Sequence, residues 1–360
     1  MKRSILITVF CFLFFGCERN DKLNEAVVIP PEEFDANLTI TPIVVDNNED
    51  YFDILSSAPV VIIVDEYHFV IDESGTITEY RGHQGISLVI PSTINDIPVT
   101  AIGDGVFEGL DLIDVIIPDT ITSIGARAFE GNQLSTVLIP DSVTYIGDFA
   151  FFHNRLISVV IPNSVTSLGI RVFGDNQLTS VTIPDSVTLI ENLAFHNNNL
   201  ESIIIPDGVT LIGLDAFRSN QLVSATIPDS VTFMAEGAFA DNRLAFVTIP
   251  RGGTFITLDG FANNRLASVT ISDNITRIWH GAFRNNLLTS IIIPASVSSI
   301  GSEAFWNNPL TTITIGAGVA LGSGSMSFGP SFGDGFDDFY NANGRMAGTY
   351  VFSDGQWSME

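Results

Sequence analysis

The sequence predicts an α/β repeat solenoid, with a parallel β-sheet on one wall and short helical or 3₁₀ turns on the opposite wall. Three observations lead to this prediction. Phenylalanine recurs every 22 residues from Phe107 to Phe305, leucine from Leu112 to Leu310, and asparagine from Asn132 to Asn308. A fixed period of this length indicates a repeat architecture, in which each coil buries its apolar face against the next one.

One unit reads LTSVTIPDSVTLIENLAFHNNN from Leu178 to Asn199, and its residues are numbered here as positions 1 to 22. Side chains alternate along a strand, so positions 4 and 6 face the core while positions 3 and 5 face solvent. Proline at position 7 has no N–H to donate and ends the strand. The Asp-Ser pair at positions 8 and 9 favours a turn. Positions 10, 13 and 18 then return apolar side chains to the core from the opposite wall.

The remaining positions predict how each coil closes. The Gly-x-x-Ala-Phe stretch at positions 14 to 18 is too short for a stable helix, so we expect one turn, of 3₁₀ type. Asparagine at position 21 lies where the chain turns back into the next strand. A buried amide at this point is expected to bond backbone groups that no strand reaches.

Both ends of the repeat array are expected to carry caps, because a terminal coil has a neighbour on one side only. Alternating residues around Glu73-Ser74-Gly75 predict a hairpin in an N-terminal cap over residues 61–85. The repeats then cover residues 86–322. A Gly-rich linker and a C-terminal cap follow over residues 323–360, with Asp354-Gly355 as the turn of a second hairpin.

The first residues are typical of a targeting segment. Met1-Lys2-Arg3 gives a positive start, and an apolar run from Ile5 to Phe15 is too short to span a membrane. The run ends at Gly16-Cys17, which resembles the lipobox of bacterial lipoproteins, although Phe14 stands where leucine is usual. The resemblance implies a signal peptide over residues 1–16 and lipid attachment at Cys17. Residues 17–60 are then expected to form an acidic tether; simple secretion is the alternative.

The repeat unit itself resembles the bacterial leucine-rich repeat of the BspA-like surface-protein family. The shared signature is a strand ending in Ile-Pro-x-Ser-Val, then Ile-Gly-x-x-Ala-Phe, then Asn, and it covers the chain from Ile86 to about Leu321. The resemblance implies a leucine-rich-repeat solenoid exported to the cell envelope. It further implies a role in adhesion or in binding proteins of a host or a neighbouring cell.

Composition excludes several classes of function. The chain has 41 acidic and 15 basic residues, a net charge of −26, which disfavours nucleic acid as a partner. The five histidines share no repeat position, and no catalytic triad, cofactor motif or metal-ligand set emerges. We therefore expect no enzyme activity, no cofactor and no metal. An interrupted column of acids at position 8 is interpreted as turn-stabilising, with Ca²⁺ binding as the alternative: Asp119, Asp141, Asp185, Asp207, Asp229 and Asp273.

The outward face of the sheet is the predicted binding surface, because positions 3 and 5 are rich in Ser, Thr and aliphatic residues and nearly free of charge. Phe246 is the aromatic residue in the position-3 column and the expected anchor. The candidate ligand-binding residues are Thr182, Ser224, Thr226, Phe246, Thr248, Ser268 and Thr270. A group of arginines is the alternative surface, expected to face an acidic partner: Arg243, Arg251, Arg265, Arg277 and Arg284.

Three functional hypotheses follow from these residues. The first is a monomeric, lipid-anchored envelope protein, at the outer membrane or cell surface, that binds another protein. It would contact the membrane through its lipid alone. The second is a glycan-binding envelope protein, for which aromatic platforms would be needed. The third is a structural spacer of the envelope without a specific ligand.

Overall fold

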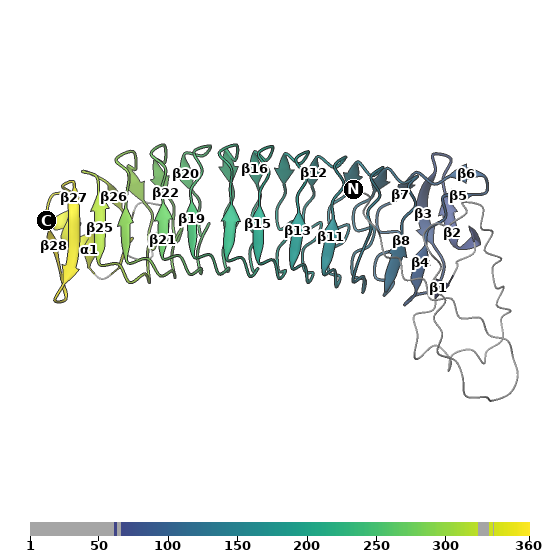
Figure 1. The fold of residues 1–360 in the computed structure, drawn as a ribbon, viewed down its shortest axis with the longest axis horizontal. Helices are drawn as coiled ribbons and strands as arrows, with labels where there is room; N and C mark the ends of the chain where they lie inside the picture. Colours follow the sequence, from purple (N-terminus) through teal and green to yellow (C-terminus); the bar gives the residue numbers. More distant parts are fainter. Residues whose placement is uncertain (1–60, 63–65, 323–330, 334) are drawn as a thin grey trace, which may run out of the picture. The chain divides into compact units, whose positions relative to one another are not determined.

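The computed structural model describes residues 61–62, 66–322, 331–333 and 335–360, all within one compact unit that covers residues 52–360. Their coils follow one another in a single row, each stacked on the one before (Figure 1). Parallel strands line the row and helix is nearly absent. The predicted solenoid with a parallel sheet is therefore confirmed.

The first wall consists of short strands that begin at position 3 and end at position 5 or 6. They pair two by two between neighbouring coils, in parallel and in register, so that Ser158 lies opposite Ser180 and Phe246 opposite Ser268. Proline at position 7 follows most of these strands two residues later, as expected, whereas Ser272 and Gly316 take this position in two of the coils. The strands are β4 (Ser87–Val89), β8 (Asp114–Ile116), β11 (Ser158–Val160), β13 (Ser180–Thr182), β15 (Ser202–Ile204), β17 (Ser224–Thr226), β19 (Phe246–Thr248), β21 (Ser268–Thr270), β23 (Ser290–Ile292) and β25 (Thr312–Ile315).

A second parallel ladder, which the sequence analysis did not predict, runs along the opposite side of each coil. Its two-residue strands occupy positions 12 and 13, except for the last one, at positions 11 and 12. In the others, position 12 faces outward and position 13 is buried. The strands are β7 (Ala101–Ile102), β9 (Ser123–Ile124), β10 (Tyr145–Ile146), β12 (Ser167–Leu168), β14 (Leu189–Ile190), β16 (Leu211–Ile212), β18 (Phe233–Met234), β20 (Phe255–Ile256), β22 (Arg277–Ile278), β24 (Ser299–Ile300) and β26 (Ala320–Leu321).

Positions 14 to 20 form turns in the described coils, where the sequence suggested 3₁₀ helix. Their backbone N–H groups bond the next coil: Leu193 N–H donates to Leu214 O at 2.7 Å, and Phe195 N–H to Ala216 O at 2.9 Å. In addition, Leu193 at position 16 and Asn197 at position 20 are left-handed, with φ of 59° and 53°. A right-handed 3₁₀ helix cannot pass through such residues.

The core contains a continuous column of phenylalanine rings. From Phe107 to Phe305 the rings at position 18 are fully buried, with neighbouring centroids 5.2–5.8 Å apart and planes within 19° of parallel. Offset stacking adds to the free energy gained by burying each ring. The prediction that each coil buries its apolar face against the next one is therefore confirmed.

The asparagine at position 21 bonds backbone groups of two coils, as expected. In the unit from Leu178, Asn198 Oδ1 accepts the Leu178 N–H at 2.9 Å. Its Nδ2 donates to Phe173 O of the preceding coil at 2.9 Å and to Phe195 O of its own coil at 3.2 Å. The same pattern repeats from Asn132 to Asn308, and every one of these amides is buried.

The N-terminal end is covered by a hairpin on the second wall. The hairpin strands are antiparallel, and the second of them continues the parallel ladder by pairing with β7. A smaller hairpin interrupts the first repeat at Asn95 and Asp96, both left-handed. The elements are β1 (Val61–Ile62), η3 (Glu66–His68), β2 (Phe69–Ile71), β3 (Thr76–Tyr80), β5 (Thr93–Ile94) and β6 (Ile97–Pro98).

The C-terminal end is covered by helix α1 (Phe336–Ala342) and by the hairpin of β27 (Gly348–Ser353) and β28 (Gln356–Met359). β27 pairs antiparallel with β25 and so closes the first wall. Phe332 continues the ring column 4.9 Å beyond Phe305, and Phe336 packs edge-on against it. The hairpin agrees with the predicted fold class, whereas α1 was not expected from this Gly-rich region.

Replacing a position-21 amide should destabilise the solenoid. In Asn198→Ala the Leu178 N–H and the carbonyls of Phe173 and Phe195 lose their partner in an apolar interior, at a cost of about 2–5 kcal/mol. Urea unfolding followed by circular dichroism measures the loss.

The matched control is Asn199→Ala, because Asn199 is the exposed neighbour at position 22. We expect it to change stability by less than about 0.5 kcal/mol. Equal unfolding midpoints for the two variants would contradict the role given to the amide column.

Candidate functional site

The structure places the predicted binding residues together on the outward face of the first wall. They lie on β13, β17, β19 and β21, and all are exposed except Ser224, which is half-buried. Phe246 lies directly across the ladder from Ser268, and Thr248 from Thr270. The predicted residues therefore form one nearly uncharged surface, called the sheet face here. Their role in binding remains a prediction.

Phe246 is an unusual residue on this face. Its side chain is 59% exposed, and no other aromatic ring or guanidinium lies against it among the described residues. In contrast, Phe233 on the second wall packs edge-on against Phe255 at 6.1 Å. An unsupported exposed ring has most of its apolar area left to bury, which is the property of a binding anchor.

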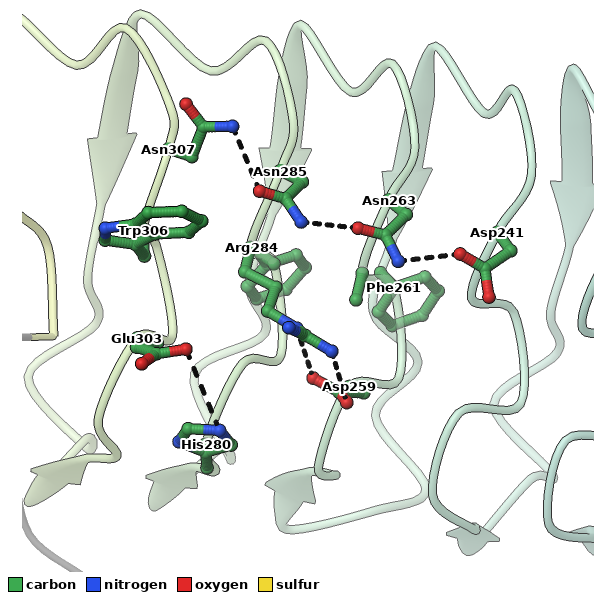
Figure 2. A network of polar contacts seen from close by, with 12 residues as sticks. Asp241, Asp259, Phe261, Asn263, His280, Arg284, Asn285, Glu303, Trp306 and Asn307 are labelled. Atoms are coloured by element: carbon green, nitrogen blue, oxygen red, sulfur yellow. Dashed lines mark hydrogen bonds and ion pairs between the residues drawn. The ribbon is translucent and has the colours of Figure 1, made fainter. Parts of the chain in front are cut away.

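The five arginines do not form the single edge that the sequence suggested. Arg243 and Arg265, at position 22, precede β19 and β21 beside the sheet face, whereas Arg251 follows β19 and Arg277 lies on the second wall. Arg284 lies on the side of the coil formed by the turns at positions 14 to 20, called the turn wall here. It pairs with both carboxylate oxygens of Asp259, at 2.8 and 2.9 Å (Figure 2). The group is therefore spread around the coil, because its members occupy repeat positions 8, 12, 19 and 22.

An open depression of about 640 Å³ borders the sheet face where the strands begin. Its lining comes from positions 22 and 2 of successive coils, and so it carries amide, hydroxyl and charged side chains in place of a deep apolar pocket. The lining residues are Thr179, Asn199, Glu201, Gln221, Val223 and Arg243. The depression adds polar contacts at the rim of the sheet face and offers no enclosed site for chemistry.

The turn wall carries a one-directional chain of side-chain hydrogen bonds at position 20. Asn307 Nδ2 donates to Asn285 Oδ1 at 3.0 Å, and Asn285 Nδ2 donates to Asn263 Oδ1 at 2.5 Å (Figure 2). Asn263 Nδ2 then donates to Asp241 Oδ1 at 2.6 Å. These residues are left-handed, a conformation that Asn and Asp tolerate best after glycine. The chain holds neighbouring turns in register.

The same wall holds half-buried titratable groups. Burial lowers the pKa of His196, against the opposing influence of Asp175 and Asp215. Burial raises the pKa of the Glu130 carboxyl, although Arg127 opposes the change. His280 Nε2 lies 4.0 Å from Glu303 Oε2. These groups are spread over separate coils and do not converge on one point.

Two further surfaces were missed by the sequence analysis. Arg127 and Arg171 at position 16 both lie over the Phe149 ring, with the guanidinium carbons 4.8 and 5.8 Å from its centroid. On the second wall, Tyr145 and Phe233 are exposed at position 12. Listing each outward position as a column would have revealed both sets, because their residue types depart from those of neighbouring coils.

The described residues contain no group of three or more His, Cys, Asp or Glu placed to hold a metal ion. The position-8 carboxylates are exposed, and Asp229 Oδ1 accepts the Arg251 N–H at 2.8 Å. Within the same part of the chain, no helix has the length and apolarity that a membrane crossing requires. Cys17, the signal segment and the tether lie outside the described residues.

Among solved structures, the chain is similar to a leucine rich cell surface protein from Faecalibacterium prausnitzii, with 28% identity and a TM-score of 0.45, over 73% of this chain and 90% of that one. It is similar to a leucine-rich repeat protein of T. pallidum, with 28% identity and a TM-score of 0.44, over 50% and 88%. The pneumococcal vaccine antigen PcpA matches with 20% identity and a TM-score of 0.51, over 73% and 83%, which supports the fold.

No curated protein matches the chain. The model of one protein family, described as the BspA type leucine-rich repeat region, matches six copies within residues 100–224 and 210–326. These two stretches cover most of the solenoid and include the coils of β9 through β26. Because the matched copies extend over more than half of the sequence, the chain belongs to the BspA type leucine-rich repeat family.

Proposed function

We propose that this protein is a lipid-anchored component of the cell envelope that binds another protein through the sheet face. The observation that carries the proposal is the exposed Phe246 ring on β19, which pairs in parallel with the Ser- and Thr-bearing strand β21. Membership of a leucine-rich repeat family supports protein binding as the general role. The anchor and adhesion to a host or neighbouring cell are parts of the proposal.

The chemistry of the sheet face suits an extended protein contact. Hydroxyl groups at Thr248, Ser268 and Thr270 can donate and accept hydrogen bonds, while the ladder beneath already satisfies the strand backbone. Covering Phe246 would contribute on the order of 2 kcal/mol from apolar burial. Arg243 and Arg265 make no ion pair within the described residues, and they add positive charge at the rim of an otherwise acidic chain.

The lipid anchor rests on the sequence around Cys17. A short apolar run that ends in Gly16-Cys17 is suited to signal cleavage before the cysteine, which would then be the sole thiol of the mature chain. Several acyl chains on one residue hold a protein to a bilayer far better than a single chain. The acidic tether, residues 17–60, would separate the solenoid from the membrane surface. This arrangement places the protein at the outer membrane or cell surface.

Substitutions on the sheet face should abolish binding without unfolding the solenoid. Phe246→Ala removes the anchor and should weaken binding at least tenfold, and Thr248→Arg should do more because it adds a long charged side chain. The measurement is capture of surface proteins from candidate host or neighbouring cells on immobilised solenoid, with binding quantified by biolayer interferometry.

The control is Tyr145→Arg, an equally bulky change at an exposed residue of the second wall. It should leave binding unchanged. Loss of binding with Tyr145→Arg but not with the sheet-face variants would contradict the proposed surface. Binding of purified envelope glycans that depends on Phe246 would favour the glycan-binding alternative, and no specific ligand at all would favour the spacer.

The anchor predicts a defined mature amino terminus. Intact-protein mass spectrometry should show a chain that begins at Cys17 and carries acyl groups, and Cys17→Ser should move the protein from the membrane fraction to the soluble fraction. Surface proteolysis of intact cells distinguishes outward display from an inward-facing anchor. Membrane retention of Cys17→Ser would contradict the lipid-anchor proposal.

A further inference from the structure

One coil of the solenoid lacks an apolar side chain that its neighbours have. Position 10 carries valine or isoleucine in the other described coils from β9 to β26, and each of these side chains is at most 2% exposed. In the coil of β19 the residue is Gly253. The filled positions are Ile121, Val143, Val165, Val187, Val209, Val231, Ile275, Val297 and Val319.

The missing side chain leaves a small, partly open apolar cavity, in which the centre of a water-sized group has about 20 Å³ of free space. Val231 and Ile275, the position-10 residues of the two adjacent coils, lie on its two sides. Met234, Ile249 and Phe255 also line it, and Phe255 is half-buried at its outer edge. The cavity is therefore a side-chain vacancy within a column that is otherwise filled.

The backbone does not require glycine at this residue. A Cβ added to Gly253 would have Thr232 O as its nearest neighbour at 3.4 Å, and Gly253 is not left-handed. The adjacent Gly252 differs, because its Cβ would lie 2.3 Å from Val231 O. Gly252 thus allows a close approach of two coils, whereas a Cβ at Gly253 would make only ordinary van der Waals contacts.

Positive charge lies beside the vacancy. Arg251 replaces the usual aspartate of position 8, and Arg277 lies on β22, next to Phe255 in the second ladder. Both are exposed, and neither makes an ion pair within the described residues. The nearby carboxylates are Asp229, which accepts the Arg251 N–H, and the exposed Asp273 of the next coil. The two guanidinium groups therefore remain available to an incoming carboxylate.

We propose that the Gly253 vacancy receives a valine- or isoleucine-sized side chain from an acidic segment of the partner protein. The size follows from the residues that fill position 10 elsewhere, and the acidic character follows from Arg251 and Arg277. The inference rests on the proposed protein-binding function. It adds the chemical character of the partner segment, which is an aliphatic side chain flanked by acidic residues. Gly253 follows the last residue of β19, Thr248, by five residues in the same coil.

The test uses peptide Glu-Glu-Val-Glu-Glu, with Glu-Glu-Gly-Glu-Glu and Lys-Lys-Val-Lys-Lys as probes of the side chain and of the charge. Binding is followed by NMR of the ¹³C-labelled Met234 methyl group, since Met234 lines the vacancy. We expect the valine peptide to shift this signal in the wild-type protein. The glycine and lysine peptides should bind at least tenfold more weakly.

Gly253→Val supplies the missing side chain from the chain itself. It should raise the urea-unfolding midpoint and at the same time weaken binding of the valine peptide at least tenfold. A purely structural glycine would give the opposite result for stability. Arg251→Ala with Arg277→Ser, substitutions that use residues found at the same positions of other coils, should weaken binding while leaving the unfolding midpoint unchanged.

Equal binding of the valine peptide to wild type and Gly253→Val, or equal binding of the valine and glycine peptides, would overturn the proposal. Equal binding of the lysine peptide would overturn the acidic partner. These outcomes are distinct from failure of the proposed function. If the proposed function itself were wrong, Phe246→Ala and Thr248→Arg would leave capture of the partner protein unaffected.

Discussion

The buried amide at position 21 joins three backbone segments that no β ladder reaches. At this corner the chain leaves the turn wall and enters the next strand, so its N–H and carbonyl groups point into an apolar interior. Asparagine supplies one acceptor and two donors from a short side chain; aspartate would lack the donors. Because Asn198 bonds Phe173 of the preceding coil as well as its own, a coil of a different length would break contacts in two coils. The constant period of 22 residues follows from this constraint.

The same constraint divides each coil into residues that must repeat and residues that need not. Inward positions carry the phenylalanine column, the amide column and the aliphatic core, and they tolerate few residue types. Outward positions are less constrained, although the position-20 side chains bond one another from coil to coil. Phe246 and Arg251 therefore differ from their counterparts without any structural demand. Gly253 differs at an inward position, where a smaller side chain weakens packing. It is therefore more informative about function than the differences at Phe246 and Arg251.

Much of the fold could be predicted because its determinants are periodic. Phe129 and Asn132 have the same environment as their equivalents 22 residues later, so one register defines the core, the first wall and the need for caps. The second ladder was missed because two-residue strands such as β14 leave no alternation to recognise. The turns at position 16 were mistaken for 3₁₀ helix because residues as different as Arg127 and Leu193 adopt a left-handed conformation there. Of the candidate site, the sheet-face residues were placed correctly, whereas the arginines were grouped by sequence proximity although they lie on different walls.

The aromatic column is closed at both ends by rings from outside the repeats, with Tyr80 against Phe107 at one end and Phe332 against Phe305 at the other. Between these two closures, a coil meets nearly the same neighbours wherever it stands. Duplication or deletion of the gene segment that encodes one 22-residue unit would thus lengthen or shorten the stack by about 4.8 Å per unit. The ring contacts at both ends of the column would remain intact. Such a protein can change its length through recombination alone.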